Sequence, residues 1–237
     1  MTASITVDVD GVAGLACRPG GPWQARLTAR SEHAYVWRGL ERVLAVLADH
    51  DALATFYVPG ATAAENPAAL REVLDAGHEI AHHGFAHLPT PALTFDGERE
   101  ELVRGLVALQ DQLGVTARGY RSPGWELTPA TLELLPELGF AWDSSLMADE
   151  RPYRLGELVE LPVHWRLDDV PYWLAYRDPR EVLAIWTTEY DAADGGHITF
   201  TIHPEHTGRG HRLTLLDGLL DHIGPTVKHS DACAALI

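Results

Sequence analysis

Cysteine is scarce in this chain of 237 residues: Cys17 and Cys233 stand near opposite ends, and there are no others. Two cysteines supply neither a disulfide framework nor a thiolate metal site. We therefore expect two unpaired thiols in a reducing compartment.

Positive charge is also in short supply, with 18 lysines and arginines against 34 acidic residues and a formal net charge of −16. Sequence-independent binding to nucleic acid or to an anionic membrane face needs a net basic surface, so we expect neither. The net charge does not identify a substrate, because substrate binding depends on the local site.

Long hydrophobic runs are missing too, since no apolar segment approaches the roughly 18–20 residues that cross a bilayer. The start Met1-Thr2-Ala3-Ser4 lacks the basic and apolar regions of a secretory signal, which predicts a cytoplasmic protein. That location favours a small-molecule substrate over an extracellular polysaccharide, although an intracellular glycan precursor is a further option.

The chain does contain enough apolar sequence, 46% of its residues, to bury a large core as one domain spanning residues 1–237. The predicted strands are Ile5 to Val9, Ala54 to Val58, Glu79 to Ala81, Arg118 to Tyr120, Phe140 to Trp142, Val159 to His164 and Ile198 to His203. Helical periodicity predicts helices at 35–50, 66–77, 98–113, 129–138, 179–190 and 213–223. This alternation predicts an α/β fold with a parallel sheet, closed or nearly closed as a seven- or eight-stranded (β/α) barrel.

Two segments show neither periodicity: Val12 to Ser31, after the first strand, and Ser145 to Gly156. We expect both to be loops, and the first to lie on the face of the barrel where active sites are built. Contact with substrate and a plain surface excursion are equally good interpretations of these segments.

Asp10, His83 and His87 together supply two imidazoles and one carboxylate, the ligand set of a catalytic divalent ion with an open position. The histidines are four residues apart, so a helical turn would face them the same way. A histidine pair at this spacing also arises by chance in a chain with 13 histidines. His82 would point elsewhere and is interpreted as structural.

Asp8 stands two residues before Asp10 in an apolar strand, so both carboxylates are expected on one side. Two acids there would repel each other unless a cation lay beside them. Asp10 would bind that cation and Asp8 would be free to act as a base. The alternative is a strand end that simply protrudes into water.

Two further residues at strand ends carry suitable chemistry. Arg121, before a rigid turn, could hold Asp8 in its charged form, although an arginine at a strand end is usually a surface charge. His203, at the end of a late strand, is well placed for proton transfer near neutral pH.

Trp125, Trp165 and Tyr172 are candidates for an apolar wall against the substrate, with core packing as the equal alternative. Asp168 and Asp169 have no assigned role. They could orient His203 or Arg121, or merely end a strand.

In their order along the chain, these motifs resemble the polysaccharide deacetylases of the NodB-homology type, carbohydrate esterase family four. The matching residues are Asp8 and Asp10, His83 and His87, Arg121 and Pro123, and Ile202 and His203, together with the stretches Ala54 to Gly60 and Ala76 to His83. The resemblance covers nearly the whole chain. It implies a distorted (β/α) barrel and a homo-oligomer, with a tetramer among the options.

The chain departs from the family pattern at two places: Val9 separates the usually adjacent aspartates, and Gly84 replaces the serine or threonine after the first metal histidine. Both changes look like the branch that contains intracellular peptidoglycan-deacetylase-like proteins, cyclic imidases and allantoinase-type members. The stretches 143–147 and 161–169 also look like that branch. The resemblance therefore implies hydrolysis of a non-peptide C–N bond more firmly than it implies a substrate.

The resulting hypothesis is a hydrolase that uses a divalent ion, with Zn²⁺ as the first choice, and acts on a small amide, a cyclic imide or an N-acetylated sugar. Asp8, oriented by Arg121, is the expected base, and His203 is expected to protonate the departing nitrogen. The alternatives are a polysaccharide or peptidoglycan N-deacetylase, a catalytically silent ligand-binding barrel, and a metal-free hydrolase.

Overall fold

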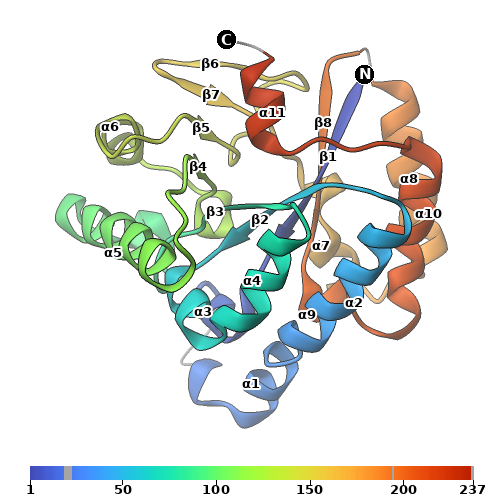
Figure 1. Ribbon diagram of the computed structural model, residues 1–237, viewed down its shortest axis with the longest axis horizontal. Coiled ribbons are helices and arrows are strands. Elements are labelled where there is room, and N and C mark those ends of the chain that lie inside the picture. The colour runs from blue at the N-terminus through green and yellow to red at the C-terminus, as the bar shows by residue number, and fades with distance from the viewer. Residues whose placement is uncertain (19–22, 194, 236–237) are drawn as a thin grey trace.

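The structure, a computed structural model, describes residues 1–18, 23–193 and 195–235. At its centre lies a curled eight-stranded sheet in the order β6-β7-β5-β4-β3-β2-β1-β8 (Figure 1). The strands are β1 (Thr2–Asp8), β2 (Ala54–Val58), β3 (Glu79–His82), β4 (Gly119–Tyr120), β5 (Trp142–Asp143), β6 (Tyr153–Leu155), β7 (Leu158–Glu160) and β8 (His197–Ile202). All neighbours pair in parallel except β6 and β7, which are antiparallel. The predicted α/β fold is confirmed, as a half-barrel with β6 and β8 at its two edges.

Helices pack along this sheet (Figure 1). They are α1 (Leu27–His33), α2 (Val36–Asp49), α3 (Gly60–Glu65), α4 (Pro67–Asp75), α5 (Phe95–Leu113), α6 (Pro129–Glu137), α7 (Asp169–Leu174), α8 (Pro179–Ala192), α9 (Pro204–Thr207), α10 (Thr214–Ile223) and α11 (His229–Ala234). The longer helices α2, α4, α5, α6, α8 and α10 agree with the predicted ones. The short helices α1, α3, α7, α9 and α11 have only four to seven residues, too few for a periodic signal. Among the described helices, none is long and apolar enough to cross a membrane.

The two segments predicted to be irregular contain some regular structure. The first includes the 3-10 helices Gly11–Ala16 and Trp23–Ala25 and the beginning of α1, while residues 19–22 lie outside the described residues. The second includes β6, which forms a hairpin with β7. A loop prediction failed here because 3-10 turns and a three-residue strand have no period that a sequence can display.

β1 shows how the sheet positions functional side chains. Successive side chains of β1 point to opposite faces of the sheet, and apolar and polar residues alternate accordingly. Ile5 and Val7 join the main apolar core, which includes residues of α2, α8 and α10. Thr6 and Asp8 face the other way and contact Arg121 from β4's end. Since parallel strands end at a common edge, the residues that follow several strands meet there.

The opposite end of the half-barrel is covered by α11, which lies beside the start of β1 (Figure 1). His229 of α11 is fully buried, with Nδ1 2.7 Å from Tyr57 Oη and Nε2 3.3 Å from Thr199 Oγ1. Its backbone N–H donates to Thr55 Oγ1. This end is therefore held together by buried hydrogen bonds between side chains far apart in the sequence.

Candidate active site

The carboxyl ends of the strands open into a cavity of about 250 Å³. Of the residues predicted for the site, Asp8, Asp10, His83, His87, Trp125, Trp165 and His203 line this cavity. Arg121 lies beneath it, in contact with Asp8. Tyr172 is not part of this lining: its hydroxyl donates to Arg166 O and its ring packs against the main core, so its contact with substrate stays a prediction.

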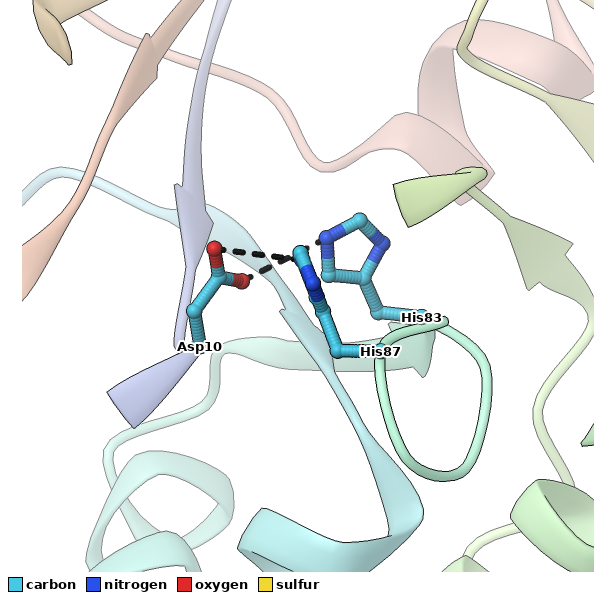
Figure 2. A group of neighbouring side chains, drawn as sticks. All are labelled: Asp10, His83 and His87. Carbon is cyan, nitrogen blue, oxygen red and sulfur yellow. Dashed lines mark ion pairs between the residues drawn. The ribbon is translucent and has the colours of Figure 1, made fainter. Parts of the chain in front are cut away.

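Asp10, His83 and His87 place one ligand atom each within 4.8 Å of one another. The Asp10 carboxylate faces both rings (Figure 2), with Oδ1 3.4 Å from His83 Nε2 and Oδ2 3.2 Å from His87 Nε2. Donor atoms bound tetrahedrally at roughly 2.0–2.2 Å from one zinc ion lie about 3.4 Å apart. The spacing of these side chains therefore fits a divalent ion.

A loop, not a helical turn, brings the two histidines together. After β3 ends at His82, the chain turns through Gly84 and His87, whose φ angles are +73° and +55°. Glu101 supports the loop, because its Oε2 accepts two backbone N–H groups from it. His82 points away from the cavity and its Nε2 donates to Leu102 O, which agrees with the structural role expected for it.

Hydrogen bonding leaves the proposed ligand atoms available. His83 Nδ1 donates to Arg121 O at 2.7 Å, which leaves the lone pair of a neutral imidazole on Nε2, facing Asp10. Within the described chain, Asp10 Oδ1 and both ring nitrogens of His87 are buried without a hydrogen-bond partner. Buried polar atoms normally have partners, so Asp10 Oδ1 and the nearby His87 Nε2 are atoms that a bound ion could satisfy.

The pKa values at the same point show that the buried Asp10 carboxylate is stabilised by neighbouring positive charge. Burial alone would raise the pKa of Asp10, but His87 and His83 outweigh burial and hold that pKa well below its usual value. Burial alone would likewise lower the pKa of His87, and the Asp10 carboxylate instead raises it well above its ordinary value. The buried carboxylate thus needs positive charge beside it, as a divalent ion would provide.

Asp8 is paired with an arginine that has no access to solvent. Arg121 donates to Asp8 Oδ1 at 2.6 Å, and its other donors bind Thr6 Oγ1 and both the hydroxyl and the carbonyl of Ser144. Its guanidinium carbon lies 4.2 Å from the centre of the Tyr57 ring. The contact predicted between Arg121 and Asp8 is present, and the alternatives of a surface arginine and a solvated strand end are excluded by burial.

His203 is held in place by Asp169, one of the two aspartates to which the sequence gave no role. Its Nδ1 donates to Asp169 Oδ1 at 2.8 Å, and Nε2 lies 3.8 Å from Asp10 Oδ2. Burial would lower the pKa of His203, but Asp169 and then Asp168 outweigh it and raise the pKa well above its ordinary value. Burial also raises the pKa of Asp168 to about 7. Asp169 therefore orients His203, and Asp168 lines the cavity beside it.

Trp125 and Trp165 form one aromatic surface at the cavity. Their rings are stacked, with centres 4.5 Å apart and planes 16° apart. Trp125 is buried and Trp165 is largely exposed, so the stacked pair extends from the interior to the mouth. The lining of the cavity thus has an apolar part, formed by these two rings, and a polar part, formed by carboxylates and histidines.

Among the lining residues that were not predicted to belong to the site are His33, Glu205 and His206. His33 Nδ1 lies 2.9 Å from Gly11 O and 3.5 Å from Glu205 Oε1, while Glu205 Oε2 is a further buried atom without a partner. The adjacency of Glu205 and His206 to His203 was a signal available in the sequence. His33 gave no such signal. It reaches the cavity from α1, a short helix that begins inside the segment predicted to be irregular and ends just after it.

Comparison with protein families finds the polysaccharide deacetylase model, which matches residues 37–142. A peptidoglycan deacetylase from Helicobacter pylori is 28% identical over 92% of this chain and 88% of its own length. A peptidoglycan deacetylase-like protein from Gibberella zeae is 23% identical over 94% of this chain and 82% of its own length.

Solved structures give the same picture for the fold. A candidate polysaccharide deacetylase from Mycobacterium smegmatis superimposes with a TM-score of 0.89 and 34% identity, covering 99% of this chain and 89% of that one. The allantoinase PuuE superimposes with a TM-score of 0.87, covering 98% and 89% of the two chains. At 18% identity, the second likeness concerns the fold alone.

Proposed function

This chain belongs to the polysaccharide deacetylase family and is a hydrolase of carbon–nitrogen bonds other than peptide bonds, and we propose that it works with a divalent metal ion. The proposal makes Asp10, His83 and His87 the ligands, Asp8 the base and His203 the acid. One observation carries it: the three ligand atoms converge in the same cavity as an aspartate–arginine pair and a histidine–aspartate pair.

The donor set supports a metal ion that keeps an open coordination position. Two imidazoles and a carboxylate are typical of catalytic zinc, and the orphaned atoms of Asp10 and His87 need a ligand. Bound there, Zn²⁺ or a similar ion would activate water and polarise an amide carbonyl. The hydrogen bond from His83 to Arg121 O fixes the ring in the tautomer that such binding requires.

Asp8 is suited to remove a proton from the attacking water. Arg121 occupies Oδ1 and stabilises the charged carboxylate, while Oδ2 lies on the side of His83, 3.9 Å from its Nε2. The water oxygen then forms a bond to the carbonyl carbon, and its proton passes to Asp8. Arg121 is a positioning residue, because it acts through Asp8 and through its own carbonyl contact with His83.

His203 is suited to complete the reaction. Asp169 holds Nδ1 and stabilises the protonated ring, so Nε2 is aimed into the cavity. As the C–N bond breaks, Nε2 gives its proton to the departing nitrogen. The amide thus becomes a carboxylic acid and an amine.

For the substrate, we propose the N-acetyl group of an amino sugar, with a small amide or cyclic imide as the second candidate. The name of the Helicobacter pylori relative, a peptidoglycan deacetylase, favours the N-acetyl group. The stacked Trp125 and Trp165 offer an apolar surface for an amino sugar or for a cyclic imide. A silent binding barrel is disfavoured because every catalytic position is filled. The cytoplasmic location, the homo-oligomer and the single domain over residues 1–237 stay predictions.

The test is a turnover assay on a panel of N-acetylated amino sugars and cyclic imides, with and without a chelator. Released acetate identifies deacetylation, and a ring-opened acid identifies imide hydrolysis. We expect acetate release that stops after chelation and returns with Zn²⁺. Turnover that is unaffected by complete removal of metal would overturn the metal-dependent mechanism.

A further inference from the structure

Two arginines and a tryptophan form a positive surface at the mouth of the active-site cavity. Arg18 and Arg26 place their guanidinium carbons 4.5 and 4.0 Å from the centre of the Trp23 ring. These residues line an open hollow of about 580 Å³ that continues from the active-site cavity, because Arg18 and Glu32 line both. We call Arg18, Trp23 and Arg26 the arginine–tryptophan cluster.

The cluster runs against the charge of the rest of the molecule. The chain carries a formal charge of −16, yet the described lining of this hollow has two arginines and one acidic residue, Glu32. No carboxylate of the described chain lies within ion-pair distance of Arg18 or Arg26. Several other described arginines on the surface do pair with one, as Arg38 does with Glu41 and Arg180 with Asp178.

The depth of the cavity has the opposite character. Asp8, Asp10, Asp168 and Glu205 all line it, so a negative group on a substrate would be repelled there. At the mouth, stacking on Trp23 restrains the guanidiniums before any ligand arrives. An ordered guanidinium binds carboxylate or phosphate oxygens through two parallel hydrogen bonds and gives up little entropy to do so.

From this arrangement we infer that Arg18 and Arg26 form a subsite for an anionic group, a carboxylate or a phosphate, on the molecule whose amide is hydrolysed at Asp10, His83 and His87. This inference rests on the proposed function and adds the substrate class to it. The amide end of the substrate would lie among the catalytic residues and the anion at the arginine–tryptophan cluster. Neutral N-acetyl sugars would then bind more weakly than charged ones.

Three sugars that share one N-acetyl group test the inference: N-acetylglucosamine is neutral, N-acetylmuramic acid adds a carboxylate and N-acetylglucosamine 6-phosphate adds a phosphate. For the unaltered protein we expect kcat/KM to be about 10-fold higher for at least one charged sugar, through a lower KM. The sugar with the larger gain tells carboxylate from phosphate. The gain should shrink at high salt, because exposed charges are screened.

The double variant Arg18→Gln with Arg26→Gln should lose this charged-over-neutral ratio, again through KM and not kcat. Arg180→Gln is the matched control, because Arg180 is exposed, pairs with Asp178 and does not line the cavity. A variant that merely disturbs the loop would lower turnover of all three sugars equally and leave the ratio unchanged. That result, or an equal kcat/KM for all three in the unaltered protein, overturns the inference.

Calorimetric titration of the same sugars, in the same proteins, distinguishes failure of the inference from failure of the proposed function. If no sugar is turned over but a charged sugar binds and the double variant loses that binding, the subsite stands and the deacetylase proposal fails. If sugars are turned over with no preference for charge in rate or binding, the deacetylase proposal stands and the subsite fails.

Discussion

His87 and His229 are both buried histidines within the half-barrel, yet their surroundings differ completely. Both ring nitrogens of His229 have partners, Tyr57 and Thr199, at the end of the sheet covered by α11. Neither ring nitrogen of His87 has a hydrogen-bond partner in the described chain, at the end that opens into the cavity. The fold thus satisfies both ring nitrogens of His229, whereas His87 is free to bind the metal ion that we propose.

This difference separates residues that stabilise the protein from residues that act in it. Burial lowers the pKa of His229 well below its ordinary value, so the ring stays neutral. Its hydrogen bonds join α11 to β2 and β8. His87, Asp10 and Glu205 keep buried atoms without partners around one cavity, whereas the other unpartnered buried atoms of the described chain, such as His197 Nε2, do not line it. Changes at the two ends should therefore affect different measurements.

The largest effect is expected for Asp8→Asn at the open end. An amide cannot accept the proton from water, so kcat should fall by about 10²–10⁴-fold while the metal ligands remain. Arg121 loses the negative charge of its partner, which also lowers stability, so turnover is measured per folded, metal-loaded chain. His83→Ala is the matched comparison and should lose both metal and turnover. Wild-type turnover in Asp8→Asn would remove Asp8 from the role of base.

A smaller effect, on stability, is expected for His229→Ala at the covered end. The change leaves a cavity and orphans the Tyr57 and Thr199 hydroxyls, so the free energy of unfolding should fall by about 2–4 kcal/mol. Denaturant unfolding measures the loss, and metal content should not change. The control His222→Ala removes an exposed ion pair with Asp191 and should cost less than about 1 kcal/mol. Loss of metal from His229→Ala would break the distinction between the two ends.

The smallest effect concerns Glu160, a buried carboxyl group whose protonation makes the free energy of unfolding depend on pH. Burial, and then the neighbouring Asp143, raise the pKa of Glu160 to about 10. Folded Glu160 therefore keeps a proton that the unfolded chain has lost, so the free energy of unfolding falls as pH rises from about 4.5 toward 10. Glu160→Gln has no proton to lose and should reduce the loss of stability between about pH 6 and pH 8 by about 1–3 kcal/mol. Identical pH dependence of unfolding in both proteins would show that Glu160 is ionised in the fold.

Much of the fold was predictable because periodicity and strand chemistry are local. The apolar face of α2 and the alternation in β1 are visible in the sequence, and both elements form as predicted. β6 was not predictable, because its pairing with β7 depends on contacts and not on its own three residues. The same holds for α11, whose role comes from the barrel it covers.

Within the site, residues at strand ends were predictable and residues brought in by loops were not. Asp8 is the last residue of β1, Asp10 follows it and His203 follows β8, and parallel pairing fixes the common edge of these strands. The convergence of His83 and His87 depends on a loop with two positive φ angles, for which spacing suggested a helical turn. The position of Tyr172 outside the cavity lining was not predictable either, since an aromatic residue in a short helix carries no sign of which way it faces.

Elemental analysis of the purified protein, beside His87→Ala, decides whether Asp10, His83 and His87 bind a metal ion. The account predicts about one divalent ion per chain in the unaltered protein, and loss of both ion and turnover in His87→Ala and after chelation. A folded protein that turns over its substrate at full rate without any metal would contradict it. Asp10, His83 and His87 would then have to act as a hydrogen-bonding site and not as metal ligands.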